Sequence, residues 1–122
     1  MQHPEYQIDS AFLADYYKDL VDEVGEIFQL FLQETPQDIE NIRHNFILGN
    51  YTNAASLMHK IAPTFYNVGL PKLTAQLQAI EATVLTGQID KAKADMQSFE
   101  AEFNNYLPAI NKELSRLTAL NT

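Results

Sequence analysis

The chain has 122 residues, 46% of them hydrophobic, which is enough for one domain with its own core and too little for two. It contains no cysteine, which excludes disulfides, thiol nucleophiles and cysteine-ligated zinc. Its 16 acidic and 8 basic residues give a net charge of −8 without a basic cluster, so nucleic acid is not an expected partner.

The first segment, residues 1–8, is expected to be a tail, and the domain is expected to cover residues 9–122. This tail lacks the apolar centre of a signal peptide. A short helix from about Ser10 to Tyr17 is predicted next, and its apolar and aromatic residues are expected to cap one end of the domain.

Four longer stretches have apolar residues at alternating steps of three and four, the spacing of one face of an α-helix. They run from Leu20 to Phe46, from Met58 to Val68, from Leu73 to Val84 and from Ile89 to Leu117. No segment shows the strict alternation that is typical of a half-buried strand. Gly49, Gly69 and Gly87 separate the four stretches, and glycine is the commonest residue just past a helix end.

Short connections make consecutive helices antiparallel. The predicted fold class is therefore all-α, an antiparallel up-down-up-down four-helix bundle with a short N-terminal capping helix. Pro36 lies within the first long stretch, for which one kinked helix is preferred to two, and Pro71 suits the first turn of a helix. Pro63 and Pro108 fall inside helical patterns, and Pro63 removes the backbone bond to the carbonyl of His59.

Membrane and metal sites are not predicted. No apolar run approaches the length of a bilayer span, so a soluble, cytoplasmic protein is expected. A monomer is also expected. The three histidines, His3, His44 and His59, lie far apart, and no Glu-x-x-His motif of a di-metal bundle occurs. His44 is expected to be a solvated residue on the outer side of its helix.

His59 lies off the apolar stripe of its predicted helix. At 100° per residue, its neighbours on the same face are Ala55, Ser56, Ala62, Pro63 and Tyr66. Because four of these five are compact, His59 is expected to be accessible to a bulky partner, as a nucleophile that attacks another protein's phosphate must be. These five residues are the predicted docking face for such a partner. From spacing alone, an exposed helix residue without a function is the more frequent explanation.

The stretch from Leu57 to Leu70 resembles the signature of histidine-containing phosphotransfer (HPt) domains. The residues that match the signature or continue it are His59, Ile61, Val68, Gly69, Leu73, Leu77, Ile80 and Glu81. The resemblance extends from about Ile8 to Leu117, and Gly69 is its structural glycine. It implies a four-helix bundle that carries a phosphoryl group on His59.

Two positions depart from the family pattern. Ala62 replaces the usual lysine three residues after the histidine, and Pro63 replaces the glycine that follows it. In the family, that lysine helps to hold the phosphoryl group and to meet the acidic site of the partner. Lys60 is the candidate substitute, although it lies about 100° around the helix. These changes bear on partner choice and transfer rate more than on the activity itself.

The resemblance also implies the partners and the reaction. The aspartyl phosphate of a receiver domain docks over His59, a ring nitrogen attacks it, and a second receiver later takes the group away. The partners are receiver (response-regulator) domains and a hybrid histidine kinase. The magnesium ion belongs to the receiver, so no cofactor is expected in this chain, which is a phosphoryl carrier of two-component signalling rather than an enzyme.

Glu81 is predicted to orient His59. In the hairpin around Gly69 and Leu70, facing positions have a nearly constant sum of residue numbers, which places His59 opposite Ile80 or Glu81. Ile80 belongs to the buried stripe, so a Glu81 carboxylate is expected within about 3.2 Å of a ring nitrogen of His59. Such a contact fixes the imidazole tautomer and leaves the other nitrogen free to attack. Pairing of Glu81 with solvent or a nearby lysine is an equal alternative.

Two other functions remain open. A degenerate HPt domain could bind receivers without passing phosphate, since Ala62 and Pro63 depart from the pattern. A helical adaptor could instead use Tyr66 as an exposed aromatic anchor for an unrelated partner.

Overall fold

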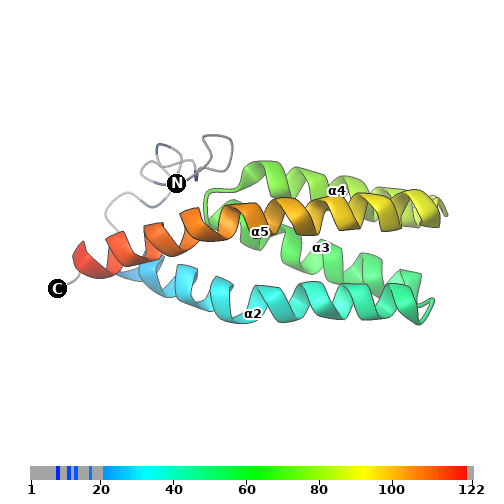
Figure 1. Ribbon diagram of the computed structural model, residues 1–122, viewed down its shortest axis with the longest axis horizontal. Coiled ribbons are helices and arrows are strands. Elements are labelled where there is room, and N and C mark those ends of the chain that lie inside the picture. Colours follow the sequence, from blue (N-terminus) through cyan, green and yellow to red (C-terminus); the bar gives the residue numbers. More distant parts are fainter. Residues whose placement is uncertain (1–7, 9–10, 12, 14–16, 18–20, 121–122) are drawn as a thin grey trace.

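The computed structural model describes Ile8, Ala11, Leu13, Tyr17 and residues 21–120. Four long helices account for nearly all of this part of the chain (Figure 1). They are α2 (Val21–Ile47), α3 (Tyr51–Asn67), α4 (Pro71–Leu85) and α5 (Ile89–Leu120). No strand occurs among the described residues, so the predicted all-α class is confirmed.

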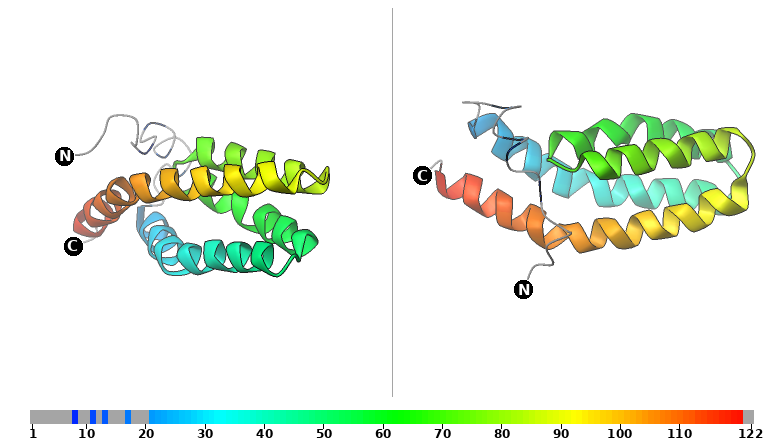
Figure 2. Two further views of the ribbon diagram at one scale, coloured as in Figure 1. Left: turned by 45° about the vertical axis from the view of Figure 1, so that its right-hand side comes forward. Right: turned by 90° about the horizontal axis from the view of Figure 1, so that it is seen from above.

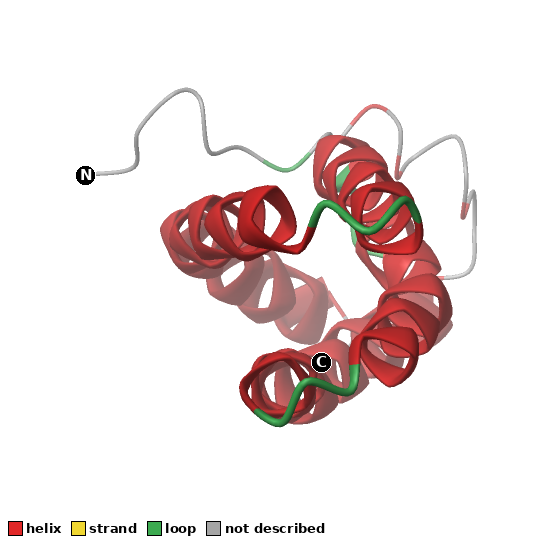
Figure 3. Cartoon of the chain, turned by 90° about the vertical axis from the view of Figure 1, so that its right-hand side faces the viewer, coloured by secondary structure: helices red, strands yellow, loops and turns green. Residues whose placement is uncertain are grey.

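The helices form an antiparallel bundle with up-down-up-down connections (Figure 2). Each helix packs against the next in the sequence, and α2 also packs against α5, which closes the ring of four seen along the bundle in Figure 3. The predicted bundle is therefore confirmed. The three predicted helix stops are confirmed as well, because Gly49, Gly69 and Gly87 have φ angles of 77°, 80° and 81°. These left-handed conformations favour glycine, which lacks a Cβ atom.

Prolines are accommodated inside three of the helices. Pro36 lies inside α2, which runs through it as one helix, as preferred from the sequence. Pro63 and Pro108 lie inside α3 and α5, and Pro71 occupies the first turn of α4. In that turn the missing amide hydrogen costs no helical bond.

The core is centred on Phe65 of α3, which is fully buried. Its ring contacts Phe31 of α2 at 5.3 Å and Phe99 and Phe103 of α5 at 5.4 and 5.8 Å between centroids, all edge to face. Edge-to-face aromatic contacts add to the stabilisation that comes from area burial alone. The apolar stripes read from the sequence thus meet at this aromatic cluster, while the other faces of the helices carry the polar residues.

The N-terminal segment packs against the α3–α4 turn. The hydroxyl of Tyr17 donates a hydrogen bond of 2.6 Å to the carbonyl of Asn67. Ile8 was assigned to the tail, yet it is buried beside Gly69 and therefore belongs to the packed domain. Most of the predicted capping helix, residues 10–17, lies outside the described residues. The described residues of this segment, Ala11, Leu13 and Tyr17, have helical backbone, and Leu13 and Tyr17 are buried.

Candidate functional site

His59 lies in the middle of α3 with its side chain 80% exposed. Met58, directly before it, and Ile61, two residues after it, point into the core with less than 3% exposure. A side chain about 100° away from such a stripe faces outward. The sequence prediction that His59 is accessible agrees with this placement.

Glu81 of α4 faces the imidazole ring of His59. The Nδ1 atom of His59 lies 3.2 Å from Oε2 and 3.3 Å from Oε1 of Glu81, so the predicted distance is confirmed. The Glu81 side chain is only 18% exposed, because it lies in the seam between the two helices. With the proton on Nδ1, the ring donates to this carboxylate, and Nε2 keeps its lone pair for a nucleophilic attack.

A buried hydrogen bond joins α3 and α4 beside this pair. The hydroxyl of Thr74 donates to the carbonyl of Ala62 at 2.7 Å, one turn of α3 beyond His59. Thr74 is one of two polar side chains that are buried among the described residues. Sequence reasoning missed Thr74, although a threonine between Leu73 and Leu77 on an apolar stripe was a readable signal. The bond fixes the two helices relative to each other where His59 and Glu81 meet.

Two residues of the predicted docking face are not on the surface. Ala55 and Ala62 are 3% and 1% exposed, so their assignment to an accessible face was wrong. Both lie on the edge of α3 that α4 covers, and their small side chains allow the two helices to approach closely. The substitution Ala62→Arg therefore perturbs the interior rather than the surface.

The other predicted docking residues are exposed. Ser56, Pro63 and Tyr66 lie on the outward side of α3 together with His59. We refer to these four residues, Ser56, His59, Pro63 and Tyr66, as the acceptor face. Pro63 has no amide hydrogen, so the carbonyl of His59 lacks the helical bond that another residue at position 63 would donate.

Lys60 is exposed on the side of α3 that faces α2. Its electrostatic partner is Asp38 of α2. Burial, followed by repulsion from Glu34, raises the pKa of Asp38, and the charge of Lys60 opposes this shift. The described residues offer Lys60 no ion pair within 4 Å. Its support of a phosphoryl group on His59 stays a prediction.

Gly69 ends the segment that resembles the family signature. Its φ of 80° and its burial against the N-terminal segment explain why glycine is required there. A Cβ atom at this position would lie 2.6 Å from Cγ2 of Ile8. Gly69 therefore has a structural role in joining α3, α4 and the N-terminal segment.

The described residues contain neither a membrane-spanning helix nor a cluster of potential metal ligands. None of the helices in this part of the chain combines the length and apolar character needed to cross a bilayer. Within the same residues, no three His, Asp or Glu side chains come together as potential metal ligands.

The chain matches a protein-family model. The family model described as Hpt domain matches residues 26–119, which include His59, Glu81 and all four residues of the acceptor face. Neither the curated proteins nor the solved structures contain a match to the chain. Because the family model covers well over half of the sequence, the chain belongs to the Hpt domain family, whose members are phosphoryl carriers for histidine phosphotransfer in two-component signalling.

Proposed function

We propose that this protein is a phosphorelay carrier, which accepts a phosphoryl group on His59 from the aspartyl phosphate of a receiver domain and passes it to a second receiver. The single observation that carries the proposal is the contact of the exposed His59 with Glu81 through Nδ1. It leaves Nε2 as the ring nitrogen available to an incoming phosphoryl group.

The proposed transfer is a displacement at phosphorus. The lone pair of Nε2 attacks in line, the N–P bond forms, and the P–O bond to the receiver's aspartate breaks, which returns a free carboxylate to the receiver. The reverse displacement, by an aspartate of the second receiver, removes the group. Such transfer depends mainly on positioning and electrostatics, and Glu81 supplies the positioning by holding the Nδ1 proton.

The proposed docking surface is the acceptor face. Serine and proline flank His59 and keep the surface low, which allows a receiver to bring its phosphoryl group to Nε2. Tyr66 adds an exposed aromatic ring at one end of this surface. Aromatic side chains often contribute strongly to the centre of protein interfaces.

The proposal extends to the partners and the cellular setting. The partners are receiver domains of response regulators and of a hybrid histidine kinase, and the protein acts as a cytoplasmic monomer. All residues that follow the N-terminal tail form one domain.

A receiver-binding protein without phosphotransfer is the second candidate. Because alanine carries no charge, Ala62 in place of the usual lysine brings no cation to the acceptor face, and its side chain is buried. Without a cation, the developing negative charge at phosphorus is less well stabilised. Binding of a receiver without transfer would favour this second candidate.

Phosphotransfer profiling tests both functions. The purified chain is incubated with radiolabelled phosphorylated receivers from the source organism, and an acid-labile, alkali-stable label on the chain is measured. We expect a label on wild type, none on His59→Gln, and a wild-type level on the control His44→Gln, whose histidine is exposed on α2. Equal labelling of His59→Gln and wild type contradicts the proposal, and receiver binding without any label supports the degenerate carrier.

A further inference from the structure

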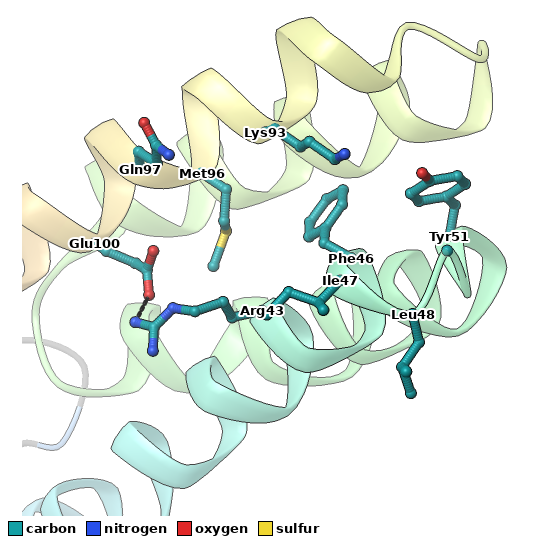
Figure 4. A pocket seen from close by; sticks show the side chains of 10 residues that line it. Arg43, Phe46, Ile47, Leu48, Tyr51, Lys93, Met96, Gln97 and Glu100 are labelled. Atoms are coloured by element: carbon teal, nitrogen blue, oxygen red, sulfur yellow. Dashed lines mark hydrogen bonds and ion pairs between the residues drawn. The ribbon is translucent and has the colours of Figure 1, made fainter.

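A cavity of about 440 Å³ lies at the end of the bundle away from Gly69, between the end of α2, the start of α3 and α5 (Figure 4). It shares no residue with the acceptor face. Its lining combines apolar side chains with two cations, and the residues that matter here are Arg43, Phe46, Ile47, Leu48, Lys93 and Met96. Nothing in the proposed phosphotransfer uses this cavity.

The apolar part of the cavity has a buried wall and an exposed rim. Phe46 and Met96 form the wall and are buried in the core. Ile47 and Leu48 form the rim, and they are 74% and 59% exposed. Large apolar side chains exposed beside a cavity are typical of a ligand-binding surface. The rim therefore extends the apolar surface available to a bound molecule.

The two cations differ in their partners. The guanidinium of Arg43 is paired with the carboxylates of Glu40 and Glu100, so its charge is compensated. The ammonium of Lys93 lies 6.0 Å from the centre of the Tyr51 ring, and no carboxylate of the described residues lies within ion-pair distance of it.

Lys91 provides a contrast on the same helix, because its ammonium lies 2.8 Å from Oδ2 of Asp95. In a chain with 16 acidic and 8 basic residues, an unpaired cation over an apolar cavity provides a place for an anion. Glu100 also lines the cavity, and its charge disfavours a ligand with several negative charges. A single negative charge on an apolar body matches this lining best.

We propose that this cavity binds a small amphipathic monocarboxylate. Its carboxylate lies at Lys93, and its apolar body packs against Phe46 and Met96 and extends over the rim. The volume falls in the range of about 300–1,000 Å³ that is common for small-molecule sites. The net charge of −8 does not prevent binding, because at physiological ionic strength charges beyond about 8 Å are screened.

Titration of the full chain with sodium octanoate, followed by NMR, tests the proposal. We expect saturable shifts of the Met96, Ile47 and Leu48 methyl groups, which acetate does not cause because it lacks the apolar body. Across hexanoate, octanoate and decanoate, each added methylene should tighten binding about threefold to fourfold. Absence of saturable shifts at these methyl groups with any of the three carboxylates overturns the proposal.

Substitution of the lysine tests the role of charge. Lys93→Gln should weaken octanoate binding about threefold to fivefold and leave the weaker binding of 1-octanol unchanged. The matched control Lys91→Gln should bind octanoate as wild type does. Equal octanoate affinity in Lys93→Gln and wild type contradicts the proposal, as does binding of an acidic, leucine-containing peptide at these methyl groups where octanoate does not bind, since that marks a protein-docking site.

Discussion

Glu81 reaches Nδ1 of His59 with both carboxylate oxygens, at 3.2 and 3.3 Å, although the two residues lie on different helices. The ring is held from one side by a carboxylate in the helix seam, while most of the His59 side chain is exposed. In the proposed relay, this arrangement gives the two ring nitrogens different roles. One nitrogen is oriented by the protein, and the other is available to a partner.

Glu81→Ala should therefore slow phosphotransfer without weakening receiver binding. A net hydrogen bond contributes about 1 kcal/mol, so a loss of about fivefold in the transfer rate is expected. Glu81→Gln should recover most of the rate, because an amide oxygen still accepts from the Nδ1 hydrogen. Rapid-quench kinetics measure the rate, with Glu26→Gln on the exposed side of α2 as control. A Glu81→Ala variant that transfers at the wild-type rate would refute the orienting role.

The docking face is tested by arginine at two positions on α3. Ser56→Arg adds bulk to the acceptor face, so transfer should fall about tenfold while the free energy of unfolding changes by less than about 0.5 kcal/mol. Ala62→Arg forces a charged side chain between α3 and α4, and should cost at least about 2 kcal/mol in stability. Urea unfolding and transfer assays separate the two effects. Unchanged stability of Ala62→Arg contradicts its burial, and unchanged transfer by Ser56→Arg contradicts the docking face.

Thr74→Val tests the bond between α3 and α4. Valine keeps the shape of threonine but cannot donate to the carbonyl of Ala62, so a loss of about 1 kcal/mol in unfolding free energy is expected. Thr83→Val is the matched control on the same helix, since the Thr83 hydroxyl bonds within α4 to the carbonyl of Ala79. The control should change stability by less than about 0.5 kcal/mol. Equal losses in both variants would show that the interhelical bond has no special contribution.

Gly69→Ala tests the packing of the N-terminal segment on the α3–α4 turn. Alanine at Gly69 or at Gly87 costs about 1–2 kcal/mol, because both glycines have left-handed backbone. Gly69→Ala should cost more, since its Cβ would lie 2.6 Å from Cγ2 of Ile8, whereas nothing lies within 4 Å at Gly87. Adding Ile8→Ala should recover part of the excess in a double-mutant cycle. Equal destabilisation by Gly69→Ala and Gly87→Ala contradicts this close packing.

Protonation of Asp38 should stabilise the folded protein over a limited range of acidic pH. Burial and the charge of Glu34 raise the pKa of Asp38 above its ordinary value of 3.8, so the folded state binds this proton more tightly than the unfolded state does. The resulting stability is fully present below pH 3.8 and is lost as the pH rises through the raised pKa. NMR titration of the Asp38 carboxyl carbon and urea unfolding at several pH values measure the effect.

Variants of the neighbours of Asp38 show whether each neighbour raises or lowers the pKa of Asp38. Lys60→Gln should raise the pKa of Asp38 further and Glu34→Gln should lower it, while Asp38→Asn should remove this part of the pH dependence. A pKa of Asp38 that does not respond to Lys60→Gln would contradict the coupling between α2 and α3.

The sequence by itself determined the helices and their ends. Apolar spacing defines a helix face, and a glycine in left-handed conformation ends the helix locally, so both could be read without tertiary information. The contact of His59 with Glu81 was one of two alternatives that the sequence left open, and the structure has it. The turn at Gly69 fixes the register of the hairpin, and the apolar stripe of α4 leaves Glu81 beside Ile80.

Only the tertiary structure decided how much of each helix is covered. Helical spacing gives the direction of a side chain but not the width of the sector that a neighbouring helix hides. Ala55 and Ala62 therefore looked accessible, and α4 buries them because their small side chains permit close packing. The coupling of Lys60 to Asp38 and the cavity beside Lys93 likewise join residues far apart in the chain, which are brought together only when the helices pack.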